Sequence, residues 1–115
     1  MKYNYARTGG IAAETVKISV GDAAASLKTL IDAAVSSPID WNLVRAIEIH
    51  VEDNDCRVAF GTDAANGATP VGGLRYVGQR ERIPSYPRLI SASVINATAG
   101  SDAVLMVDVE SQTDY

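Results

Sequence analysis

Hydrophobic and polar residues alternate most regularly in the middle of the chain, over residues 46–61 (AIEIHVEDNDCRVAFG). From residue 47 to residue 52 every second side chain is aliphatic and the others are Glu or His, which is the pattern of a strand with one buried face. A second alternating run covers residues 56–60. Residues 53–55 (DND) separate the two runs, and such side chains favour turns. The segment therefore predicts a β-hairpin.

The same alternation predicts further strands along the chain. They are expected over residues 16–20, around residues 74–83, over residues 89–95 and over residues 103–109. The region 74–83 is interrupted by Gly78 and by the charged run 79–82. Residues 97–102 include a glycine and read as a turn, so the last two strands are predicted to form a second hairpin.

Apolar residues change to helical spacing between residues 21 and 37. Asp22 is the expected N-cap, and Pro38 stops the segment. We predict one short helix here, with an irregular pair of strands as the alternative because alanine-rich stretches are weak evidence for a helix. Trp41, which follows, is expected to cover one end of the core.

The start of the chain is polar and is broken by a Gly-Gly pair. We interpret residues 1–14 as an extended N-terminal arm and residues 15–115 as a single domain. Tyr3 and Tyr5 would anchor the arm if a partner orders it, and a terminus without a role is the alternative.

Closely spaced strands with turn residues between them predict an all-β protein: a β-sandwich with jelly-roll or Greek-key connections, one short helix and an extended arm. A chain of 115 residues is long enough for one domain, and 47% hydrophobic with 21% charged residues is ordinary globular usage. The apolar fraction leans heavily on alanine, and the chain has one Phe and one Trp. The core is therefore expected to be thin, and partner subunits are expected to share buried surface.

The formal net charge of −4 disfavours binding to nucleic acid, which requires clustered cations. One segment differs: residues 75–88 hold four arginines and one glutamate, a net charge of +3, which leaves −7 for the rest of the chain. Tyr76 and Tyr86 lie among these arginines and could stack on single-stranded nucleic acid. Contact with an acidic protein neighbour, or with solvent, is the preferred interpretation, and no nucleic-acid partner is expected.

Candidate chemistry is sparse. Cys56 is the single cysteine and falls on the apolar face of a strand, so it is expected to be a core residue. His50 would lie on the opposite face of the predicted hairpin, which argues against thiol catalysis. Glu52, Asp53 and Asp55 lack the spacing of a calcium loop and are read as a solvated turn. No enzymatic activity, cofactor or metal is expected.

Targeting and ligand motifs add little. Residues 96–98 match the glycosylation sequon, which carries no weight without a secretory signal. The glycine-rich loop 61–73 lacks the Lys and Ser/Thr of a phosphate-binding loop. The first ten residues lack the apolar run of a signal peptide, and no stretch is long enough to cross a bilayer. We expect a protein made in the cytoplasm, with no membrane partner.

The order of motifs resembles a known group. The succession VKISV, SLKTLIDAA, RAIEIHVEDNDCRVAFGTD, GGLRYVGQRERI and LISASVINATAGSDAVLMVDVE, which covers residues 16–110, is similar to the small β-sandwich structural proteins of tailed-bacteriophage particles. This resemblance implies a virion component and, within it, a head decoration or cement protein on the outer capsid surface. Such a protein would bind the major capsid protein, bridge capsid subunits and stabilise the head, commonly as a homotrimer.

The resemblance also implies where contacts would form. Tyr3, Tyr5 and Arg7 in the arm, together with Arg80 and Arg82, are the expected capsid or subunit interface. A neck, tail or fibre-base protein of the virion is the first alternative, because it would use the same sandwich in fewer copies. A carbohydrate-binding module is a more distant alternative, since few aromatic residues are available for it.

Overall fold

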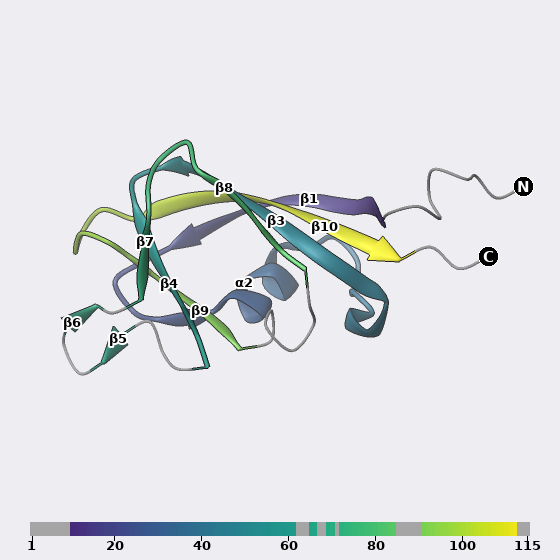
Figure 1. Ribbon diagram of the computed structural model, residues 1–115, viewed down its shortest axis with the longest axis horizontal. Coiled ribbons are helices and arrows are strands. Elements are labelled where there is room, and N and C mark those ends of the chain that lie inside the picture. The colour runs from purple at the N-terminus through teal and green to yellow at the C-terminus, as the bar shows by residue number, and fades with distance from the viewer. Residues whose placement is uncertain (1–9, 62–64, 67–68, 71, 85–90, 113–115) are drawn as a thin grey trace, which may run out of the picture.

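The computed structural model describes residues 10–61, 65–66, 69–70, 72–84 and 91–112. Two four-stranded antiparallel sheets form a sandwich (Figure 1), which confirms the predicted fold class. Sheet A has the strand order β1-β10-β3-β8, and sheet B has the order β2-β9-β4-β7. The strands are β1 Gly10–Val20, β2 Ala25–Ser26, β3 Val44–Asp53, β4 Cys56–Phe60, β5 Ala65–Asn66, β6 Thr69–Pro70, β7 Gly73–Arg75, β8 Arg80–Ile83, β9 Ala92–Asn96 and β10 Ala103–Gln112.

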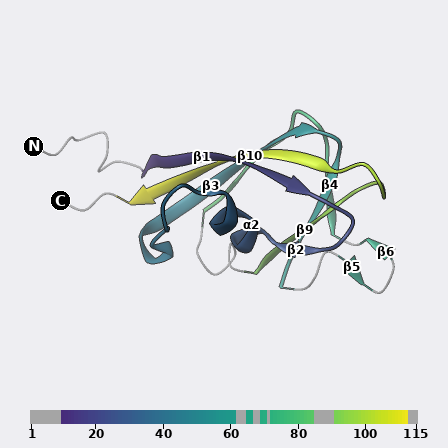
Figure 2. The ribbon, with the colours of Figure 1, turned by 180° about the vertical axis from the view of Figure 1, so that it is seen from behind.

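The strand order is that of an eight-stranded jelly roll. Strands that follow one another in the sequence take equivalent places in opposite sheets: β1 and β2, β10 and β9, β3 and β4, and β8 and β7. Figure 2 shows the same arrangement from behind, with β9 and β2 in the layer next to α2. This pairing of strands across two sheets is the jelly-roll form of the antiparallel sandwich.

Both predicted hairpins are wrong, although their strands exist. β3 pairs with β10 and β8, whereas β4 pairs with β9 and β7, so residues 54–55 cross from one sheet to the other. The same holds for β9 and β10 across residues 97–102. Asn54 has a φ of 56°, and its side chain donates a hydrogen bond to the carbonyl oxygen of Asp102. This left-handed residue reverses the chain between the two layers.

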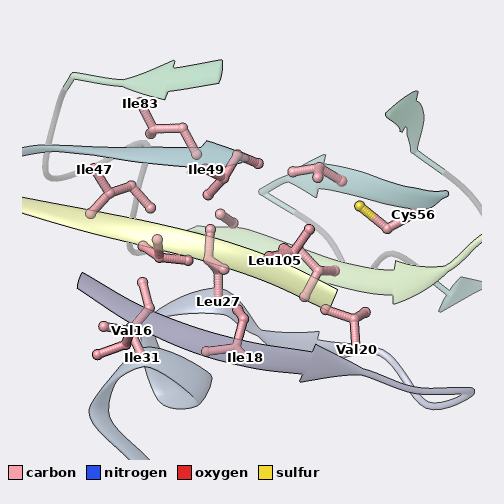
Figure 3. Close-up of a cluster of buried hydrophobic side chains, with 14 of the residues drawn as sticks. Val16, Ile18, Val20, Leu27, Ile31, Ile47, Ile49, Cys56, Ile83 and Leu105 are labelled. Atoms are coloured by element: carbon pink, nitrogen blue, oxygen red, sulfur yellow. The ribbon is translucent and has the colours of Figure 1, made fainter. Parts of the chain in front are cut away.

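The inner faces of both sheets supply the core (Figure 3). Side chains from β1, β3 and β10 of sheet A pack against β4 and β9 of sheet B and against α2 (Leu27–Ala34). Leu105 and Cys56 are fully buried, which confirms Cys56 as a core residue. Burying an aliphatic side chain of this size stabilises the fold by about 1.5–3 kcal/mol.

α2 is the predicted short helix, but its N-cap is not Asp22. The hydroxyl of Ser26 accepts a hydrogen bond from the backbone N–H of Thr29, and the helix then buries Leu27 and Ile31 on one face. The helix packs against β1 and β9, beyond the point where the two-residue strand β2 ends. The sequence favours Asp22 as the cap because it precedes the apolar run, but β2 lies between Asp22 and the helix.

Several boundaries also differ from expectation. β1 begins at Gly10 and pairs with β10 from there, so residues 10–14 belong to the sheet and residues 1–9 lie outside the described part of the chain. The charged run is itself a strand, β8. The predicted loop 61–73 contains the short paired strands β5 and β6. Trp41, in the 3₁₀ turn Trp41–Leu43, is 8% exposed and belongs to the core cluster.

Candidate functional site

Arg80 and Arg82 lie on the outer face of β8, the edge strand of sheet A. The guanidinium of Arg82 donates two hydrogen bonds to the carboxylate of Glu110 on β10, with N–O distances of 3.2 and 3.3 Å. Arg80 donates to Glu48 on β3 at 3.3 Å. Both arginines remain exposed, but each already has a carboxylate partner within the chain.

The ion pairs belong to a polar outer face on sheet A. The register places Thr15, Asp108, Glu48 and Arg82 in one row across the four strands. The Thr15 hydroxyl donates a hydrogen bond to Asp108. Cross-strand pairs of opposite charge stabilise a sheet modestly, and exposed ion pairs contribute about 0–1 kcal/mol. Positive and negative side chains on this outer face therefore largely pair with one another.

Arg75 occupies a different position, at the edge where the two sheets meet. It lies on β7 of sheet B, and its guanidinium forms a bidentate ion pair with Glu81 on β8 of sheet A. The hydrogen bond that Arg75 donates to the Glu81 carboxylate raises the pKa of Arg75 above its ordinary value, and burial opposes this shift. Each arginine of the predicted basic segment that the structure describes is thus paired in the chain, while Arg88 and Tyr86 lie outside the described residues.

Four connections between the sheets meet at one end of the sandwich, which we call the arch end: residues 21–24, 54–55, 76–79 and 97–102. Hydrogen bonds join them to one another. The Asp22 carboxylate accepts from the Asn96 side chain and from the backbone N–H of Gly100. The backbone N–H of Ala97 donates to the carbonyl oxygen of Asp55. These bonds fix the connections relative to the sheets.

The connection 76–79 carries an exposed apolar pair, Tyr76 and Val77, which are 60% and 52% exposed. Its backbone is held at every residue. The N–H groups of Tyr76 and Val77 donate to the side chains of Gln79 and Asp55, and that of Gly78 donates to the carbonyl oxygen of Val51. Gln79 in turn donates its N–H to the carbonyl oxygen of Tyr76. The pair is therefore presented on a fixed backbone.

Sequence patterns do not identify this pair as a site. They place Tyr76 in a strand, among arginines with which it could stack on nucleic acid, and they give Val77 no role. Two large apolar residues directly before a glycine are unusual in a solvated turn, where Gly, Pro, Asn, Asp and Ser dominate. This composition was the available signal.

An open pocket of about 440 Å³ lies between α2 and the chain that follows it. Its lining includes Lys28, Asp32, Ile39 and Trp41. The indole N–H of Trp41 donates to the Asp32 carboxylate at 2.7 Å, Lys28 pairs with the same carboxylate at 3.2 Å, and the Lys28 ammonium lies 5.3 Å from the Trp41 ring centroid. The polar groups of this pocket are thus mainly bonded to one another.

The remaining candidate residues are dispersed. His50 Nδ1 lies 3.5 Å from a carboxylate oxygen of Glu52 on the outer face of sheet A. Cys56 points into the core instead, and burial raises the pKa of its thiol to about 11. Asn96 of the sequon is 2% exposed, and its side-chain amide is bonded to Asp22. Tyr3, Tyr5 and Arg7 lie outside the described residues.

Among the described residues, no group of three or more His, Cys, Asp and Glu side chains is placed to hold a metal ion. No helix in the same residues is long and apolar enough to span a membrane. In comparisons with protein-family models, curated proteins and solved structures, nothing matched this chain.

Proposed function

We propose that this chain is a structural protein of a tailed-phage particle, a decoration or cement protein that binds the outer shell and bridges neighbouring subunits of the major capsid protein. The observation that carries the proposal is the jelly-roll strand order, β1-β10-β3-β8 against β2-β9-β4-β7. Viral capsid domains, lectins and cupins share this architecture. A shared architecture is only a fold-level analogy, so the support for one of these functions comes from the surfaces of the molecule.

The packed interior favours a structural role over a ligand-binding site between the two sheets. The inner faces of the two sheets carry closely packed Val, Ile and Leu side chains, with Cys56 among them (Figure 3). Space between the sheets is filled by these side chains, as in an ordinary protein core. A partner must therefore bind on the outside of the sandwich.

The outside also suits binding to another protein. Tyr side chains are typical anchors of protein interfaces, and the arch end presents Tyr76, next to the exposed Val77, on a fixed backbone. Arg80 and Arg82 add exposed charged groups along β8. Their pairing with Glu48 and Glu110 means that an acidic partner would compete with bonds inside the chain.

The test is the presence and copy number of the chain in particles. Phage-sized particles from cells that express the gene would be purified on a density gradient, and the ratio of this chain to the major capsid protein measured by quantitative mass spectrometry. A ratio approaching one is expected for a decoration protein. A small ratio would move the protein to a neck, tail or fibre base, and absence from particles would refute the virion proposal.

The pocket beside α2 favours carbohydrate binding as a second candidate function. An aromatic ring, a carboxylate and an ammonium converge there through Trp41, Asp32 and Lys28. Trp41 is nevertheless 8% exposed, so little of its ring is available to stack on a sugar. A glycan array tests this candidate directly: binding that is lost in Asp32→Ala would favour it over the virion role.

A further inference from the structure

The arch end is negatively charged as well as apolar. The four connections 21–24, 54–55, 76–79 and 97–102 contain three aspartates and no Lys or Arg, and Glu52 and Asp53 end the adjoining strand β3. The cations that flank residues 76–79 are both paired, Arg75 with Glu81 and Arg80 with Glu48. Acidic residues therefore share the arch end with the exposed Tyr76 and Val77, and the Asp55 carboxylate lies directly against the backbone of Val77.

This surface is ready to bind without rearrangement. The backbone N–H groups of Tyr76, Val77 and Gly78 are all bonded, so binding does not require the connection to order. Partners that are already ordered lose less entropy on association. A central apolar anchor inside a polar rim is the arrangement in which few residues carry most of the binding energy. The acidic rim selects a partner that is basic and aromatic.

The first nine residues of the same chain have that chemistry. They contain Lys2 and Arg7, no Asp or Glu, and the two tyrosines Tyr3 and Tyr5. Their net charge of +2 contrasts with the net charge of −4 of the chain as a whole. Tyrosines can pack on Tyr76 and Val77 while the cations face the carboxylates.

We propose that the arch end of one copy binds the N-terminal segment 1–9 of a second copy. Within a single chain, β1 lies between the N-terminal segment and the arch end, because it starts at Gly10 and reaches the arch end at Val20. Eleven residues of strand span about 36 Å. Nine fully extended residues span roughly 30 Å, so the segment falls short of the arch end of its own chain.

The contact is heterologous, since each copy offers its N-terminal segment to one neighbour and its arch end to another. Such contacts repeat head to tail and form a ring where the rotation closes. The inference goes beyond the proposed function and does not depend on it, because the assembly would form in solution without a particle. It gives Tyr3, Tyr5 and Arg7 a subunit partner rather than a capsid partner.

Sedimentation velocity on the full chain tests the proposal. At about 0.1 mM protein and low salt we expect oligomers, with a dissociation constant that rises about fivefold or more when salt is raised tenfold. The proposal would be overturned if the wild-type protein stays monomeric under these conditions. Binding of the segment to its own chain would also leave the protein monomeric, so it would count against the proposal.

Two double variants locate the contact. Lys2→Glu/Arg7→Glu alters the segment, and Tyr76→Ser/Val77→Ser alters the arch end; each should raise the dissociation constant about tenfold or more. Mixed in equal amounts they should form a heterodimer, because each retains the surface that the other lacks. Matched controls are Lys17→Glu, an exposed cation on β1, and Leu43→Ser, an apolar residue that is 46% exposed elsewhere. Unchanged assembly in either double variant, or failure of the mixture to pair, would overturn the proposal.

Discussion

The side-chain amide of Asn96 donates a hydrogen bond of 2.6 Å to the carboxylate of Asp22, 74 residues earlier in the chain. The same carboxylate accepts the backbone N–H of Gly100 at 2.8 Å. Asp22 therefore joins the first connection of the arch end to the last. Because Asn96 is almost fully buried, its side-chain amide forms its hydrogen bond with this carboxylate rather than with water.

Protonation of Asp22 is predicted to destabilise the fold. The bond from Gly100, and then that from Asn96, lowers the pKa of Asp22 below its ordinary value of 3.8. A carboxyl group with a lowered pKa contributes stability above its unfolded pKa, and this contribution is lost as the pH falls through the folded pKa. Thermal unfolding measured from pH 7 to about pH 2.5 should decline less steeply below pH 4 in Asp22→Asn than in the wild type. Asp53→Asn, at the exposed end of β3, is the control and should follow the wild type.

The thiol of Cys56 is predicted to react only after unfolding. Desolvation is the main reason that its pKa is raised to about 11 from 9.0, and the side chain is fully buried. Modification by a thiol-specific reagent near pH 8 should therefore track the unfolded fraction as denaturant is added. Because the folded pKa is raised, the contribution of this thiol to stability is complete below pH 9 and is lost as the pH rises toward 11. Rapid modification of the native protein would contradict the buried position.

Truncation of Leu105 is predicted to be strongly destabilising. This side chain lies near the start of β10 and is 0% exposed between the two sheets (Figure 3). Leu105→Ala should cost about 2–5 kcal/mol in the free energy of unfolding, because a cavity remains where the core cannot collapse. Leu43→Ala is the matched control, since exposed substitutions usually change stability by less than about 0.5 kcal/mol. Urea denaturation of the two variants measures the difference.

Arg80 and Arg82 are predicted to affect particle binding more than stability. Their partners, Glu48 and Glu110, lie on a solvent-facing surface, so Arg80→Ala/Arg82→Ala should change the free energy of unfolding by about 1 kcal/mol or less. If these residues meet an acidic shell, the same variant should bind particles more weakly and with less dependence on salt. Lys17→Ala/Arg45→Ala removes two other exposed cations and serves as the control. Equal binding by both variants would remove Arg80 and Arg82 from the interface.

The sequence predicts which side chains face the core better than it predicts which strands pair. Val51 and Cys56 face the interior whether residues 54–55 form a hairpin or cross between sheets, because alternation gives the same faces in both cases. The choice is made by contacts far apart in the chain, such as the bond from Asn54 to the carbonyl oxygen of Asp102. Local turn chemistry does not contain that information.

The candidate site was less predictable for the same reason. Arg80 and Arg82 looked like free cations in the sequence, but their carboxylate partners lie 32 and 28 residues away and become neighbours only through sheet register. The exposure of Val77 depends on its position between β7 and β8, which the predicted single strand region did not resolve.

The strand order also constrains when the chain can fold during synthesis. The strand paired with β1 is β10, the last described strand to be translated, and both neighbours of β3 also come later in the sequence. Sheet A therefore cannot assemble while β10 is still inside the ribosome. Folds dominated by such distant pairings form slowly, and their unpaired strands are prone to aggregate while they wait. Chaperone protection of the nascent chain, or slow expression, should accordingly increase the soluble yield of this protein.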